Sequence, residues 1–115
     1  MVLAVDIGNT NIVMGCFDGT ELKFRERIST NQLATDLEYA ATIKMALDMH
    51  GIGPSQLKGV IVSSVVPSVN NTFRRAIEKL TGLKPLMVGP GIKTGLSIMI
   101  DDPAQLGSDL VVDAV

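Results

Sequence analysis

The chain has 115 residues, 46% of them hydrophobic, and a formal net charge of −2, so one small domain can bury a core. The charge balance and the few aromatic residues (3%) exclude a basic, aromatic nucleic-acid interface, so no nucleic-acid partner is expected. A single cysteine excludes an internal disulfide, and one cysteine with one histidine excludes the usual zinc site, which suits a cytoplasmic protein. No signal peptide or membrane segment is expected from the sequence.

The first elements are predicted to form an antiparallel meander of three strands. An apolar run over residues 2–7 predicts a buried strand, and a tight turn leads to a second apolar strand over residues 12–17. Asp18-Gly19 is a typical hairpin turn, and residues 21–28 then alternate apolar and charged side chains. The third strand should therefore expose one face to water.

The next element is predicted to be a helix that begins after Thr35. Thr35 and Glu38 have the spacing of a capping box, and Gly51 is a typical residue just past a helix end. Four apolar side chains should form its buried face, namely Leu37, Ala40, Ile43 and Leu47. Met45 and Met49 leave a second side partly apolar; packing in the core is the preferred interpretation, and contact with a partner is the alternative.

The rest of the chain alternates strands and helices. A continuous apolar strand is predicted over residues 58–66, and a second helix should end at Gly82. One face of that helix is marked by Val69, Phe73, Ile77 and Leu80. Short strands are predicted over residues 85–88 and 96–100, and residues 107–115 read as the start of a third helix.

This order predicts an α/β fold, a mixed sheet with helices on both faces. No linker, internal repeat or low-complexity segment divides residues 1–115, so we expect a single domain. By pattern the sequence stops inside a helix with no cap, and we therefore expect it to be part of a longer chain.

Three segments contain residues suited to chemistry, and the first is the turn after the first strand. Gly8 lets a ligand approach the main chain, and a turn of this kind exposes backbone N–H groups that suit phosphate oxygens. Asp6 would repel those phosphates unless Mg²⁺ lay between them. The alternative is an ordinary hairpin turn whose N–H groups donate to Asp6.

The second segment is glycine-rich and contains Gly89, Gly91 and Lys93. It is not a P-loop, because Ile92 rather than glycine precedes the lysine. Its main chain can contact a small polar substrate, or it is a plain connection between strands.

The third segment places Asp109 at the start of the last predicted helix, where the helix dipole favours the ionised carboxylate. Such a carboxylate can accept the proton of a substrate hydroxyl during phosphoryl transfer. The alternative is that Ser108 or Asp109 is simply an N-cap. His50 is interpreted as a complement to a helix C-terminus, and Cys16 as a small core residue.

Taken together, four motifs in this order resemble the type III pantothenate kinases. They are DIGNTN at residues 6–11, SSVVPS at 63–68, VGPGIKTGL at 88–96 and DDPAQLGSDLVVDAV at 101–115. The resemblance implies the acetate and sugar kinase/Hsp70/actin fold, in which ATP lies between two ribonuclease H-like lobes, and this chain would be the first lobe. It also implies a homodimer that uses ATP, Mg²⁺ and a monovalent cation (K⁺ or NH₄⁺) to phosphorylate pantothenate, the first step of coenzyme A biosynthesis.

The resemblance also implies roles for individual residues. Asp109 would be the catalytic base, and Asp6 would also hold the metal. The ATP phosphates would be bound by the first-turn segment, namely Asp6, Ile7, Gly8, Asn9, Thr10, Asn11, Ile12 and Val13. Pantothenate would be bound by Gly89, Gly91, Lys93, Gly107, Ser108, Asp109 and Leu110.

The sequence departs from the family pattern at three positions. Leu110 stands where the family usually has arginine, Ile100 where many members have tyrosine, and Asp113 where many have asparagine. The family's adenosine and cation motif is not in these residues, so we expect no ATP turnover from them alone. Two alternatives follow: a non-catalytic nucleotide- or metabolite-binding regulatory protein of this fold, and a kinase for another small hydroxyl acid.

Overall fold

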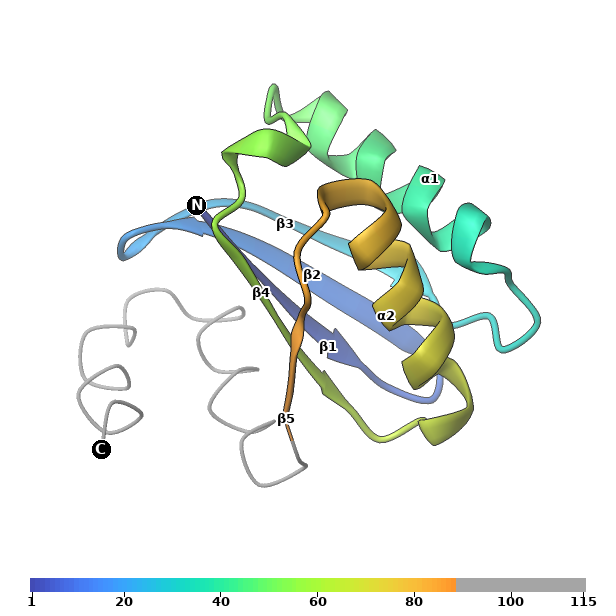
Figure 1. The fold of residues 1–115 in the computed structure, drawn as a ribbon. Helices are drawn as coiled ribbons and strands as arrows, with labels where there is room; N and C mark the ends of the chain where they lie inside the picture. The colour runs from blue at the N-terminus through green and yellow to red at the C-terminus, as the bar shows by residue number, and fades with distance from the viewer. Residues whose placement is uncertain (89–115) are drawn as a thin grey trace.

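The computed structural model describes residues 1–88, which form one mixed sheet and two α-helices (Figure 1). In chain order the elements are β1 (Val2–Ile7), β2 (Asn11–Asp18), β3 (Glu21–Ser29), α1 (Asp36–Met49), the short 3-10 helix η1 (Pro54–Gln56), β4 (Gly59–Ser64), α2 (Pro67–Thr81) and β5 (Leu86–Val88). The strands predicted at residues 96–100 and the helix predicted at 107–115 lie outside the described residues.

The sheet has the strand order β3-β2-β1-β4-β5. β1 pairs antiparallel with β2, and β2 pairs antiparallel with β3, so the predicted meander is confirmed. β4 joins the other edge of β1 in parallel, and β5 continues in parallel beside β4. β1 is therefore the central strand, and the α/β prediction is confirmed.

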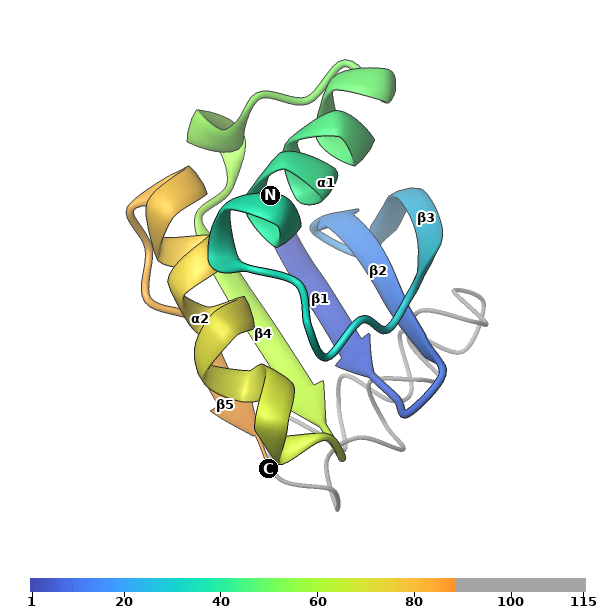
Figure 2. The ribbon, with the colours of Figure 1, turned by 90° about the vertical axis from the view of Figure 1, so that its right-hand side faces the viewer.

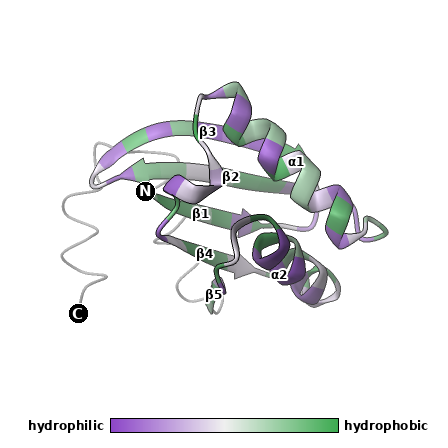
Figure 3. Ribbon diagram, turned by 45° about the horizontal axis from the view of Figure 1, so that its top comes forward, coloured by the Kyte–Doolittle hydropathy of each residue, from purple (hydrophilic) through white to green (hydrophobic). Residues whose placement is uncertain are grey.

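Both described helices cover the same face of the sheet (Figure 2). Between the helices and the sheet lies the main core, whose largest wholly buried side chains include Phe73, Leu3, Ile7, Ile12, Met14, Ile43, Leu47 and Ile77. Figure 3 shows β1, β2 and β4 as largely hydrophobic, whereas β3 alternates along its length. On the opposite face Ala4 and Phe17 form a smaller buried apolar group. Helices were predicted on both faces of the sheet. Within residues 1–88 both helices cover one face, and a helix on the opposite face stays a prediction.

The capping box that predicted α1 is present. The Glu38 N–H donates to Thr35 Oγ1 at 3.2 Å, and the Thr35 N–H donates to Glu38 Oε1 at 2.9 Å. The predicted buried face was wrong in one residue, because Leu37 is 63% exposed. Tyr39 points inward instead, and its hydroxyl donates to the Asn31 carbonyl oxygen at 2.7 Å, which sets the rotation of the helix. The preferred interpretation that Met45 and Met49 pack in the core was also wrong, because both side chains are exposed.

The second helix begins at Pro67, shortly after β4 ends at Ser64. The predicted strand over residues 58–66 is shorter in the structure, because Pro67 is the first residue of α2 and Val66 is its N-cap. The helix ends at Gly82 as predicted, with a φ of 75° that favours glycine. Leu80 is only half-buried, and Ala76 is buried on the same helix. In β5 the prediction of a buried strand was wrong for Leu86, which is 60% exposed.

The structure shows the surroundings of His50 and Cys16, two side chains that were interpreted from the sequence. His50 is the C-cap of α1, and its ring also stacks on Phe24 with centroids 4.4 Å apart, while Nε2 lies 2.7 Å from Glu26 Oε2. Cys16 is wholly buried in β2, as predicted.

Burial raises the pKa of the Cys16 thiol above its ordinary value, so the reactive thiolate is scarce in the folded state. We expect a disulfide reagent at pH 8 to modify Cys16 at least about 100-fold more slowly in the folded chain than in urea, because reaction requires opening of the strand. Absorbance of the released thiolate measures the rate. Equal rates in the two conditions would contradict the buried position.

Candidate functional site

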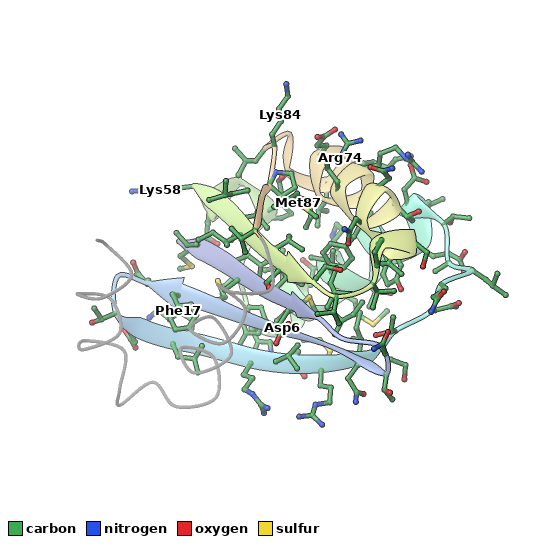
Figure 4. The ribbon with its side chains drawn as sticks, turned by 90° about the horizontal axis from the view of Figure 1, so that it is seen from below. Asp6, Phe17, Lys58, Arg74, Lys84 and Met87 are labelled. Atoms are coloured by element: carbon green, nitrogen blue, oxygen red, sulfur yellow. The ribbon has the colours of Figure 1, made fainter. Side chains whose placement is uncertain are left out.

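The first-turn segment lies at one end of the central strand (Figure 4). Asp6 is half-buried near the end of β1, and Ile7 and Ile12 are wholly buried and face the core. Between the two strands, Asn9 and Thr10 are exposed. The remaining predicted phosphate ligands, Gly8, Asn11 and Val13, are half-buried. The base of the segment is therefore fixed in the core by the side chains of Ile7 and Ile12, and its tip is exposed.

The turn is compact, and glycine is needed at its first position. The Gly8 N–H donates to the Asn11 carbonyl oxygen at 2.9 Å, which closes the turn. A Cβ atom added to Gly8 would lie 3.2 Å from that same oxygen, which is closer than most real Cβ contacts. Because the oxygen belongs to the backbone, a side chain here would push the turn open.

Thr30 holds this turn from the end of β3. Its Oγ1 donates to the Gly8 carbonyl oxygen at 2.6 Å, and its N–H donates to the Thr10 carbonyl oxygen at 2.9 Å. The turn is thus tied to a third strand as well as to β1 and β2. Sequence reasoning missed Thr30, and no local signal marks it, since it follows β3 without any recognisable motif.

On the prediction from sequence that this turn binds the phosphates of ATP, replacing Thr30 with valine is expected to weaken ATP binding to the complete chain about tenfold, because the loss of a short hydrogen bond loosens the turn. Thr30→Ser retains the hydroxyl and should bind ATP within about twofold of the parent, which makes it the matched control. Isothermal titration with ATP measures both variants. Equal affinities for the valine and serine variants would show that the hydroxyl does not position the turn.

The SSVVPS motif lies beside this turn because β4 runs parallel to β1. In the strand register Asp6 is opposite Ser63, and Ile7 is opposite Ser64. The Val65 N–H donates to the Ile7 carbonyl oxygen at 3.1 Å, and the Val66 N–H donates to Ser64 Oγ at 3.0 Å. Two motifs more than fifty residues apart in sequence therefore meet at the carboxyl ends of β1 and β4, where α2 also begins.

The residues at this edge fit a magnesium ion that is coordinated partly by the protein and partly by phosphate oxygens and water. Within residues 1–88 no group of three or more His, Cys, Asp or Glu side chains is placed to hold a metal by itself. Mg²⁺ commonly uses one or two carboxylates together with phosphate oxygens and water, so a single Asp6 beside a phosphate-binding turn fits it. Ser63 adds a buried hydroxyl without a hydrogen-bond partner in the described structure, next to Asp6 in the register.

The other predicted site residues lie outside the described residues. They are Gly89, Gly91, Lys93, Gly107, Ser108, Asp109 and Leu110. The same holds for Ile100 and Asp113, two of the three departures from the family pattern. Their roles in substrate binding and proton transfer stay predictions from sequence.

Sequence comparison decides the family. The model of the family described as type III pantothenate kinase matches residues 2–115. The chain belongs to the type III pantothenate kinase family. The resemblance carried by the four motifs is thereby confirmed, whereas the role of the turn at Asp6 in phosphate binding stays a prediction.

Curated relatives named type III pantothenate kinase match the whole chain. The chain is 46% identical to the protein of Geobacillus thermodenitrificans and 47% identical to that of Geobacillus sp. (strain WCH70), over 115 residues in both cases. A relative from Bifidobacterium longum is 46% identical over 113 residues. The chain spans 45% of the length of both Geobacillus relatives, so it corresponds to less than half of such a protein.

Solved structures share the fold. A ROK hexokinase from Thermus thermophilus superposes with a TM-score of 0.58 at 19% identity, over 76% of this chain and 34% of that one. T. thermophilus RuvC, in complex with a Holliday junction substrate, gives 0.56 at 16% identity, over 95% of this chain and 87% of that one. The predicted ribonuclease H-like, actin-like architecture is confirmed by these likenesses, which concern the fold alone.

None of the helices described in residues 1–88 has the length and apolar character needed to cross a membrane.

Proposed function

We propose that this chain is the N-terminal ribonuclease H-like lobe of an enzyme that transfers the γ-phosphate of ATP to pantothenate. This transfer is the first step of coenzyme A biosynthesis. The observation that carries the proposal is the family match over residues 2–115. The geometry supports it, because the DIGNTN turn is exposed at its tip and fixed at its base by Thr30. In this proposal residues 1–115 form one domain, and a second lobe completes the ATP site.

Each part of the site has a distinct task. Backbone N–H groups of the turn other than that of Gly8, which donates to the Asn11 carbonyl oxygen, bind the phosphates of ATP together with the side chains of Asn9, Thr10 and Asn11. Asp6 holds Mg²⁺, which when bound neutralises charge on the phosphates. Asp109 accepts the proton of the pantothenate hydroxyl as that oxygen attacks. The rate enhancement comes mainly from positioning and from charge stabilisation, as expected for phosphoryl transfer.

Pantothenate is assigned to the segments after β5. Its proposed contacts are Gly89, Gly91, Lys93, Gly107, Ser108 and Leu110. Loss of the usual arginine at Leu110 removes a partner for the pantothenate carboxylate, and Lys93 is the cation that remains in these segments. We further propose a cytoplasmic homodimer that requires a monovalent cation, K⁺ or NH₄⁺, as the family resemblance implies.

A non-catalytic regulatory protein that binds a nucleotide or metabolite is the second candidate, favoured by Leu110 and Ile100 in place of arginine and tyrosine. A kinase for a different small hydroxyl acid is the third. All three use the same turn, and they differ in whether pantothenate, another hydroxyl acid or no substrate is phosphorylated.

The decisive experiment uses the complete two-lobe chain with ATP, Mg²⁺ and K⁺. Pantothenate-dependent release of ADP, measured with a coupled assay, is the expected result. Isothermal titration with pantothenate runs in parallel, and binding without turnover would overturn the enzyme proposal. Turnover of another hydroxyl acid in a substrate panel, with none of pantothenate, would establish the third candidate. Residues 1–115 alone should release no ADP.

A further inference from the structure

Ser63 carries a buried hydroxyl that the described structure does not use. The residue is 0% exposed, and its Oγ has no hydrogen-bond partner among residues 1–88. Buried polar side chains are nearly always hydrogen-bonded, and the exceptions usually mark a missing water, an ion or a functional role. Serine is also a weak choice for packing alone, since alanine fills nearly the same space without a polar atom to satisfy.

The sheet register places Ser63 directly beside Asp6. Along β4, Val60 and Val62 face the main core, so Ile61 and Ser63 face the opposite side of the sheet. Along β1, Ala4 lies on that same opposite side, and Asp6 follows it with strand period two. Ser63 pairs in register with Asp6 on one side and with Val88 on the other. Asp6 is therefore its polar neighbour across the described sheet.

We propose that Ser63 is a positioning residue of the Asp6 metal site, an inference that rests on the proposed function. Its hydroxyl accepts a hydrogen bond from a water molecule that belongs to the hydration shell of the Mg²⁺ held by Asp6. Mg²⁺ keeps several waters when it binds to proteins, and a water bound to it is a strong donor. This partner satisfies the hydroxyl in the loaded enzyme and explains its lack of a partner in the described residues.

The proposal predicts that substitutions of Ser63 lower the affinity for the metal without lowering the stability of the fold. Removing a hydroxyl that the fold does not use should leave the unfolding temperature unchanged or raise it slightly. Loss of an outer contact to a metal site typically weakens metal affinity by about 10–100-fold. A purely structural serine would give the reverse pattern, with lower stability and unchanged metal affinity.

The test measures Mn²⁺ affinity of the complete chain by electron paramagnetic resonance, with a non-hydrolysable ATP analogue present, and the unfolding temperature of each variant. Ser63→Ala and Ser63→Cys should both weaken Mn²⁺ binding about tenfold or more, and at least one of them should be as stable as the parent. Ser55→Ala is the matched control, because Ser55 is exposed on η1 and should leave Mn²⁺ binding unchanged.

Asp6→Asn distinguishes failure of this inference from failure of the proposed function. If Asp6→Asn weakens Mn²⁺ binding and either folded Ser63 variant binds like the parent, the role of Ser63 is overturned. If Asp6→Asn itself binds Mn²⁺ like the parent, the metal site at Asp6 is wrong, and the inference falls with it. Weaker Mn²⁺ binding in the Ser63 and Asp6 variants of a chain that does not phosphorylate pantothenate would support the inference and reject the proposed substrate.

Discussion

Replacing Asp109 with asparagine in the complete chain is expected to lower kcat for pantothenate phosphorylation by about 10²–10⁴-fold. Asparagine keeps the size and polarity of the side chain but cannot accept the proton that the pantothenate hydroxyl loses. ATP affinity should change little, because the phosphates are assigned to the turn after β1. Steady-state kinetics with pantothenate, together with isothermal titration of ATP, give the two quantities.

Asp102→Asn is the matched control for this change. Asp102 belongs to the same motif but has no assigned role, so its asparagine variant should stay within about threefold of the parent. Activity of Asp109→Asn within a few-fold of the parent would remove Asp109 as the base. A rise in the KM for pantothenate with unchanged kcat would assign it to substrate binding instead.

Replacing Phe73 with alanine is expected to lower the free energy of unfolding by about 3–5 kcal/mol. Phe73 is wholly buried in α2, and its ring lies 5.3 Å from that of Tyr39 in α1, tilted by 60°. Alanine would leave a cavity between both helices and the sheet. A loss of this size is a large part of the roughly 5–15 kcal/mol that stabilises a typical domain.

Urea unfolding of the complete chain, followed by circular dichroism, measures this effect. Leu33→Ala is the control, because Leu33 is 92% exposed and its replacement should change the free energy by less than about 0.5 kcal/mol. If the Phe73 variant lost no more stability than the Leu33 variant, the described burial of Phe73 between α2 and the sheet would be contradicted.

Local signals predicted most of the elements correctly. β1 has the predicted bounds, Val2–Ile7, because an apolar run ends at a glycine-containing turn. α1 begins after Thr35 because the capping box lies within four residues of sequence. α2 ends at Gly82 because the left-handed backbone there favours glycine. Signals of this kind need no knowledge of the rest of the fold.

Features that depend on distant residues were not predicted. The hydroxyl of Tyr39 reaches Asn31, so Tyr39 rather than Leu37 points inward, although both are suited to a buried face. The pairing of β4 with β1 places Ser63 beside Asp6, and nothing within either segment indicates that register. Thr30 reaches Gly8 through a pairing of strands in the same way.

The candidate site was predictable in part for the same reason. The turn was predicted to be a phosphate site because its residue types lie next to one another in the sequence, and the family resemblance favoured this prediction over an ordinary hairpin. Thr30, which holds the turn from just after β3, and Ser63, which lies beside Asp6 in the register, became visible once the sheet was assembled. Gly89, Lys93 and Asp109 lie outside the described residues, and their assignment rests on sequence.

The central position of β1 has a consequence during protein synthesis. β2 follows β1 after a short turn and can pair with it as soon as both leave the ribosome, but the other edge of β1 waits for β4, which follows α1 and η1. Until then a nascent chain presents an apolar strand with an open row of N–H and C=O groups, the kind of edge that pairs with other chains. The period of aggregation risk therefore lasts from the emergence of β1 until β4 has left the ribosome, and a pause in translation within that interval would prolong it.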